Sequence, residues 1–157
     1  MNRRSVIGLV LATAVLTACG STSSVRQALP AAQNGKVSYQ LADVGAKGVE
    51  VPAKFIKNLR KYLEKDLDKR GLLGSGEGAR KVSVSITEFS MSQGASRLLG
   101  AFAGKDFVKA DINVVDAASN KIIGSTTIES KDGLAGGGPE LFTSNHAKAI
   151  SKFLQGK

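Results

Sequence analysis

The sequence predicts an α+β domain, a two-layer sandwich in which two amphipathic helices cover one face of about four mainly antiparallel strands. Two observations predict this class. Apolar residues recur every three or four positions in two stretches, and they alternate with polar residues in four others. The stretches follow the order β-α-β-β-β-α. Helices on one face of an antiparallel sheet leave its other face to solvent, which suits strands with one polar side.

The composition fits one folded domain of ordinary size. The chain has 157 residues, of which 42% are apolar and 22% charged, with 18 Gly, 3 Pro and one Cys. These values exclude an intrinsically disordered chain, a collagen, a coiled coil and a disulfide-rich scaffold.

The first 18 residues are predicted to be a signal peptide. Arg3 and Arg4 precede an apolar run from Val6 to Leu16. As a helix this run would reach only ~16 Å, about half of the hydrocarbon core of a bilayer. A short apolar run after a positive start is typical of a secretory signal.

The end of that run resembles the lipobox of bacterial lipoproteins. Its sequence is Leu16-Thr17-Ala18-Cys19, with the single cysteine at the cleavage position. The resemblance implies a diacylglycerol thioether on Cys19, cleavage before it and acylation of the freed amine, which together make a durable membrane anchor. Gly20 stands where Asp would retain an enteric-type lipoprotein in the inner membrane. The resemblance therefore implies the outer membrane, on its periplasmic side. The alternative is an ordinary secretory peptide.

Residues 19–35 are predicted to be the lipidated cysteine and a flexible tether, and residues 36–157 the periplasmic α+β domain. From Gly20 to Gly35 the chain is rich in small polar residues and has no strong period. A coil of this length spans ~20–25 Å, so the domain could stand away from the lipid headgroups.

The domain opens with a predicted strand and a long helix. The strand covers Lys36 to Val44, and the helix begins at Pro52. Gly71 ends the helix and is followed by Leu72 and Leu73, a pattern typical of a glycine C-cap. The apolar stripe of this helix consists of Phe55, Ile56, Leu59, Tyr62, Leu63 and Leu67.

Three further strands and a closing helix follow. The strands are predicted over Lys81 to Phe89, Phe107 to Val115 and Lys121 to Ser130, and Asp116 to Asn120 has the composition of a hairpin turn. The last helix begins at Pro139. Its apolar stripe consists of Phe142, His146, Ile150, Phe153 and Leu154.

The stretch from Ser96 to Ser130 resembles the lipoproteins of the domain of unknown function 4410 family. It joins Arg97-Leu98-Leu99-Gly100-Ala101-Phe102-Ala103-Gly104 to an alternating strand from Val108 to Val115, then Asp116 and Lys121-Ile122-Ile123-Gly124. The resemblance covers roughly Val37 to Leu154. It implies an envelope location and an α/β sandwich fold, and it implies no activity.

Residue patterns that support enzyme chemistry are not found, so we expect no enzyme, no cofactor and no metal. Gly100 to Lys105 has three residues between its glycines where a phosphate-binding loop needs four, and Asp106 stands where Ser or Thr must hold magnesium. His146 is the only histidine and falls on an apolar stripe, which favours a packed side chain over a catalytic base. One His and a lipidated Cys leave no cluster of metal ligands.

The first helix is strongly basic. Lys57, Arg60, Lys61 and Lys65 are candidate ligands for an anionic envelope molecule, such as a lipid phosphate or a glycan. The alternative is a solvated face of a lysine-rich protein. Nucleic acid is not expected as a partner, because of the compartment and an aromatic content of only 5%.

The crossover from Arg97 to Gly104 is the second candidate surface. Arg97, Leu98, Leu99 and Phe102 are candidate partner-binding residues, because a compact apolar run between two strands can dock a partner or enter lipid. The alternative is a short helix buried under the sheet.

These observations favour a non-enzymatic lipoprotein of the outer membrane with a periplasmic interaction or accessory domain. Its expected partners are the membrane, through the lipid anchor, and an envelope protein. The alternative is a module that binds an anionic envelope ligand through the basic helix.

Overall fold

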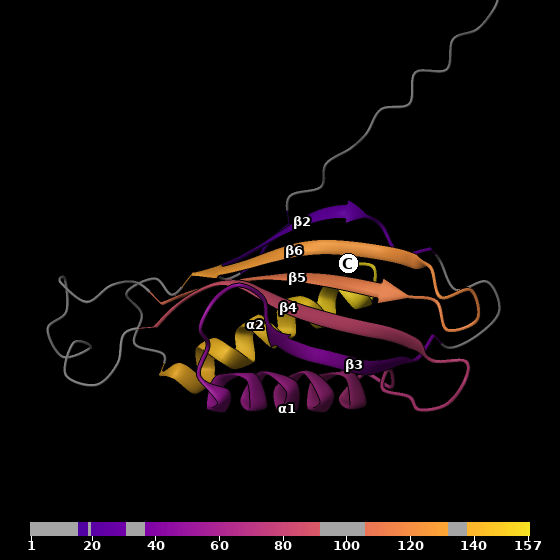
Figure 1. Ribbon diagram of the computed structural model, residues 1–157, viewed down its shortest axis with the longest axis horizontal. Coiled ribbons are helices and arrows are strands. Elements are labelled where there is room, and N and C mark those ends of the chain that lie inside the picture. Colours follow the sequence, from indigo (N-terminus) through magenta and orange to yellow (C-terminus); the bar gives the residue numbers. More distant parts are fainter. Residues whose placement is uncertain (1–15, 19, 31–36, 92–105, 132–137) are drawn as a thin grey trace, which may run out of the picture.

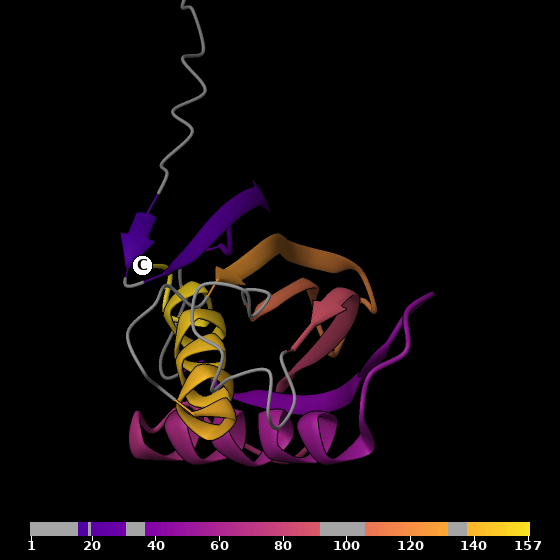
Figure 2. The same cartoon turned by 90° about the vertical axis from the view of Figure 1, so that its left-hand side faces the viewer.

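The computed structural model describes residues 16–18, 20–30, 37–91, 106–131 and 138–157, and in them two helices lie against one face of a twisted sheet (Figures 1 and 2). The elements are β1 (Leu16–Ala18), β2 (Ser21–Gln27), β3 (Tyr39–Ala46), α1 (Ala53–Lys69), β4 (Arg80–Ser90), β5 (Phe107–Val115), β6 (Ile122–Lys131) and α2 (Pro139–Leu154).

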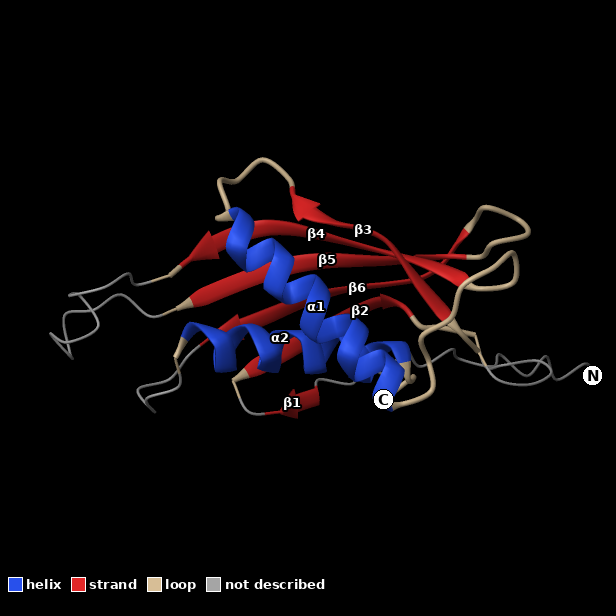
Figure 3. Ribbon diagram, turned by 90° about the horizontal axis from the view of Figure 1, so that it is seen from below, coloured by secondary structure: helices blue, strands red, loops and turns tan. Residues whose placement is uncertain are grey.

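The sheet has six strands in the order β1-β2-β6-β5-β4-β3. β3 and β4 pair in parallel, because α1 returns the chain to the edge at which β3 began, and the other neighbours are antiparallel. Both helices lie on the same face, as Figure 3 shows from below. The prediction of an α+β two-layer sandwich with two helices on one face is confirmed. The expected four strands are four of the six.

The strand that the sequence analysis missed is β2. It pairs with β6 from Ser21, opposite Ser130, to Gln27, opposite Ser125. The prediction of a flexible tether over residues 19–35 is therefore wrong for Ser21–Gln27. β1 lies within the predicted signal peptide and would be lost on cleavage before Cys19.

The physical reason for this error lies in the side chains that β2 turns toward the helices. The Ser21 hydroxyl lies 2.7 Å from the Ser130 hydroxyl, and the Ser23 hydroxyl lies 2.9 Å from that of Thr126. Hydroxyl pairs thus occupy positions that apolar residues fill in the other strands. A strand with a polar inner face has no hydrophobic alternation to reveal it.

The helices bury the stripes that their sequences predict. In α1 the buried residues are Phe55, Leu59, Leu63 and Leu67. In α2 the whole predicted stripe is buried: Phe142, His146, Ile150, Phe153 and Leu154. The two helices run in the same direction and meet at their C-terminal ends, where Arg70 donates a hydrogen bond of 3.2 Å to the Gln155 side chain. Tyr39 fixes the same end of α2 to β3, because its hydroxyl donates to the Leu154 carbonyl at 2.7 Å.

The predicted glycine C-cap of α1 is confirmed. Gly71 has a φ of +65°, in the left-handed region that favours glycine. Its N–H donates to the Asp68 carbonyl at 2.8 Å, and the Leu72 N–H donates to the Leu67 carbonyl at 2.9 Å. These two bonds form a Schellman motif, which satisfies carbonyls at the end of the helix.

Candidate functional site

The start of β2 is bonded to one end of the sheet, directly after the cysteine that is predicted to carry lipid. The Lys131 N–H donates to the Gly20 carbonyl at 2.8 Å. Along the same row Lys131 lies opposite Phe107, and Phe107 lies opposite Ser90. We call this end of the sheet, formed by Gly20, Lys131, Phe107 and Ser90, the Gly20 end.

Gly20 fits this place for two geometric reasons. Its φ is +73°, and a Cβ atom at this position would lie 2.6 Å from the Lys131 carbonyl oxygen. Any larger side chain would clash with the backbone of β6, unless the strands moved apart. Asp, which the lipoprotein resemblance links to retention in the inner membrane, would therefore meet the same clash.

The four candidate partner-binding residues, Arg97, Leu98, Leu99 and Phe102, lie outside the described residues, in the segment 92–105. The strands that flank this segment are described. β4 ends at Ser90 and β5 begins at Phe107, and these two residues pair at the Gly20 end (Figure 1). The crossover therefore leaves and rejoins the sheet at the end where the predicted anchor is attached.

Three of the four candidate residues on the basic helix form a stripe on the outside of the sandwich. Lys57, Lys61 and Lys65 are exposed and follow one another at one-turn spacing. Within the part of the chain that the structure describes, their ammonium groups have no hydrogen bond or ion pair. We call these residues the α1 lysine stripe.

Arg60 lies apart from this stripe. It is half-buried, and its guanidinium donates to the Leu41 carbonyl and to the Glu64 carboxylate, both at 3.4 Å. Its charge is therefore engaged within the domain, between β3 and α1. The prediction grouped Arg60 with the lysines because spacing alone does not show which way an arginine turns.

His146 is fully buried, and the prediction that it packs on the apolar stripe of the last helix is confirmed. Its Nδ1 lies 2.8 Å from the Ser130 hydroxyl, which in turn lies 2.7 Å from the Ser21 hydroxyl. Burial lowers the pKa of the imidazole to about 4, so His146 is neutral at neutral pH. We call Ser21, Ser130 and His146 the serine–histidine chain.

The serine–histidine chain is buried, and no described carboxylate orients its histidine. The Ser130 side chain is buried, so a substrate has no approach to its hydroxyl in this conformation. The Nε2 atom of His146 has no hydrogen-bond partner in the described residues, whereas a catalytic histidine needs a group that orients it. The hydrogen bonds of the serine–histidine chain connect β2, β6 and α2.

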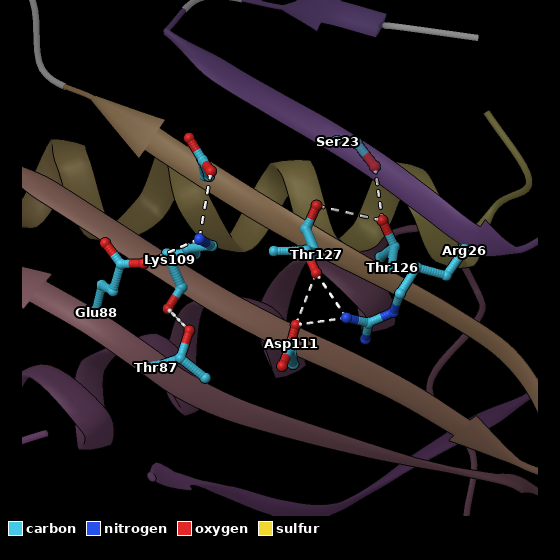
Figure 4. A network of polar contacts seen from close by, with 9 residues as sticks. Ser23, Arg26, Thr87, Glu88, Lys109, Asp111, Thr126 and Thr127 are labelled. Atoms are coloured by element: carbon cyan, nitrogen blue, oxygen red, sulfur yellow. Dashed lines mark hydrogen bonds and ion pairs between the residues drawn. The ribbon is translucent and has the colours of Figure 1, made fainter. Parts of the chain in front are cut away.

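The open face of the sheet carries a polar network (Figure 4). Arg26 on β2 donates to the Asp111 carboxylate at 2.9 Å and to the Thr127 hydroxyl at 2.8 Å, and Thr127 donates to Asp111 at 2.7 Å. Partial burial opposes the charge of Asp111, but the hydrogen bonds from Thr127 and Arg26 outweigh it and hold the pKa of that carboxyl below its usual value.

A second group of charges continues the network across the open face. The Lys109 ammonium lies 2.9 Å from the Glu88 carboxylate and 3.8 Å from that of Glu129. The Lys131 ammonium lies 3.6 Å from Glu129 and 5.5 Å from the centre of the Phe107 ring. The two groups hold three positive and three negative charges, so together they present no strong field of one sign to a ligand.

The described residues contain neither a membrane-spanning helix nor a group of metal ligands. No helix among them is both long and apolar enough to cross a bilayer. No group of three or more His, Cys, Asp or Glu side chains in these ranges is placed to hold a metal ion.

The family comparison agrees with the resemblance found in the sequence. The family model described as Domain of unknown function (DUF4410) matches residues 27–137, which is more than half of the chain. The chain belongs to this family. The match begins at the last residue of β2 and runs through the crossover and the β5–β6 hairpin.

Two solved structures share the fold at low sequence identity. A dodecamer of a PelC variant from Paraburkholderia phytofirmans is 17% identical, with a TM-score of 0.58 over 85% of this chain and 96% of that one. The PelC dodecamer from the same organism is 16% identical, with a TM-score of 0.54 over the same shares. A weaker similarity is to Lipoprotein GNA1162 from Neisseria meningitidis, which is 10% identical, with a TM-score of 0.32 over 77% of this chain and 99% of that one. The search of curated proteins found no match.

Proposed function

We propose that this chain is a non-enzymatic lipoprotein of the outer membrane, anchored through Cys19, whose periplasmic domain is an interaction or accessory module. The observation that carries the proposal is that two features meet at the Gly20 end. The residue next to the lipobox cysteine is bonded there, and the strands that flank the apolar crossover pair there.

Two features support an interaction module rather than an enzyme. The one Ser–His contact of the described residues is buried and has no carboxylate on the histidine. The carboxylates of Asp111 and Glu88 on the open sheet face are engaged in ion pairs, so they are not poised for acid–base work.

The partner that we propose is an envelope protein, and a second copy of this chain is one such protein. PelC, which shares the fold, is described as a dodecamer. The crossover residues Arg97, Leu98, Leu99 and Phe102 would make the contact close to the membrane surface. An apolar segment held at the anchored end meets partners that lie in or on the same membrane.

Crosslinking in cells tests this proposal. The wild-type chain is compared with Phe102→Asp and with Ile122→Asp, a control at the opposite end of the sheet whose side chain is 52% exposed. We expect a discrete crosslinked product, of this chain alone or with one envelope protein, that Phe102→Asp abolishes and the control retains. Identical products from all three chains would contradict docking through the crossover.

The second candidate function is binding of an anionic envelope ligand through the α1 lysine stripe. The observation that favours it is that Lys57, Lys61 and Lys65 are exposed and have no acidic partner among the described residues. Each lysine near an anionic surface contributes about 1 kcal/mol, and salt weakens the attraction.

Vesicle binding tests this second candidate. The Cys19→Ser chain, which has no thiol for an anchor, is sedimented with vesicles that contain phosphatidylglycerol. Replacing Lys57, Lys61 and Lys65 with Gln should weaken binding roughly a hundredfold at low salt. Replacing Lys81, Lys121 and Lys157, three exposed lysines elsewhere, should weaken it far less. Equal losses would show that only net charge matters.

A further inference from the structure

The predicted lipid anchor lies directly next to the folded domain. This supports an inference that rests on the proposed function and goes beyond it. We propose that the Gly20 end of the sheet lies against the lipid surface and that the strands point away from the bilayer. The surface that meets the lipid consists of Gly20, Lys131, Phe107 and the first turn of α2.

The first step is the reach of the chain. Consecutive Cα atoms are about 3.8 Å apart, so Cys19 lies within one residue of Gly20. The Gly20 carbonyl is already bonded to β6, and β2 begins at the next residue. No slack separates the acylated residue from the sheet, so the bilayer that takes up the acyl chains of Cys19 must lie next to this end.

The second step is the chemistry of this end. The Lys131 side chain is 63% exposed, and its ammonium lies over the Phe107 ring. Leu141 is 51% exposed in the first turn of α2. That turn lies at the same end, because His146 farther along α2 is bonded to Ser130, the neighbour of Lys131. A lysine, an aromatic ring and an exposed leucine suit the boundary between headgroups and acyl chains.

The third step favours an upright sheet over one that lies flat on the lipid. In the middle of the open face the charges are paired: Arg26 with Asp111, and Lys109 with Glu88. Paired charges attract anionic headgroups less than free lysines would. With β5 roughly 30 Å long at the usual rise per residue, the turn at Ala118 would lie far from the membrane.

Quenching of a fluorescent label by lipid tests the orientation. The lipidated full chain is purified with one added cysteine at a time, because Cys19 is acylated and does not react with the label. Lys131→Cys and Leu141→Cys mark the Gly20 end, on the sheet and the helix layer, and Ala118→Cys marks the opposite end. Each labelled chain is placed in phosphatidylethanolamine–phosphatidylglycerol vesicles that contain a lipid with a nitroxide headgroup.

We expect the labels at 131 and 141 to be quenched several-fold more than the label at 118. Six Gly and Ser residues inserted directly after Cys19, with Gly first, should restore a tether and reduce this difference. Equal quenching at all three positions in a chain that floats with the vesicles overturns the orientation alone. A chain that does not float overturns the anchor, and this inference with it.

Discussion

Ser21, Ser130 and His146 each place a polar atom in the interior, and each hydroxyl has a partner there. The two hydroxyls and the imidazole nitrogen form a continuous series of contacts of 2.7 and 2.8 Å from β2 to α2. A buried polar atom that loses its partner costs free energy, so a strand held in this way is sensitive to the removal of a single oxygen.

Ser130→Ala tests this sensitivity. The change leaves both the Ser21 hydroxyl and the His146 Nδ1 without their partner, so we expect the free energy of unfolding to fall by about 2 kcal/mol. Ser125→Ala is the control, because the half-buried Ser125 hydroxyl on the same strand has no hydrogen bond in the described residues. Urea unfolding measures both. Equal effects would show that the serine–histidine chain contributes nothing specific.

The buried imidazole predicts a pH dependence of stability. The pKa of His146 is lowered to about 4 in the folded chain, from 6.5 in the unfolded one. The unfolded state therefore takes up a proton first as the pH falls, and the folded state loses stability between pH 6.5 and about 4. The loss is at most about 1.4 kcal/mol per pH unit.

Urea unfolding at several pH values between 6.5 and 4.5 measures this loss. Asp66, Asp111 and Asp116 have lowered pKa values, so their contributions are lost only nearer pH 4 and below. The His146→Asn chain should show a nearly constant free energy of unfolding in this window. A slope in that chain equal to the wild-type slope would assign the dependence to other groups.

At the level of the elements, β4, β5, β6 and both helices follow from the sequence because burial acts on a regular pattern. Val82, Val84 and Ile86 alternate with polar residues, and all three are buried in β4. β2 does not follow, because it buries Ser21 against Ser130 and leaves no apolar signal. The parallel pairing of β3 and β4 depends on where the intervening helix packs, which local pattern does not encode.

The end of α1 gives a prediction at this scale. Gly71→Ala should lower the free energy of unfolding by about 1 kcal/mol, because an alanine at a φ of +65° is strained. Gly78→Ala is the matched control in the next loop, where a Cβ atom would meet nothing within 4 Å. Thermal unfolding compares the two. Equal shifts of Tm would contradict the role of Gly71 as the cap.

For the whole molecule, the sequence predicts the candidate surfaces better than their arrangement. The lysines of the basic helix are predicted by composition, and three of the four candidates are exposed together. Arg60 is not among them, because it is engaged with Leu41 and Glu64. The sequence could not predict that the crossover and the residue after Cys19 lie at the same end of the sheet, because this depends on the unexpected strand β2.

The measurement that tests the account most directly is the intact mass of the chain purified from the envelope of a bacterial host. We predict a protein that begins at Cys19, lacks residues 1–18 and carries the added mass of a diacylglycerol and one further acyl chain. The Cys19→Ser chain should lack this added mass. A wild-type chain that retains residues 1–18, or that begins elsewhere with an unmodified Cys19, would contradict the anchor at the Gly20 end.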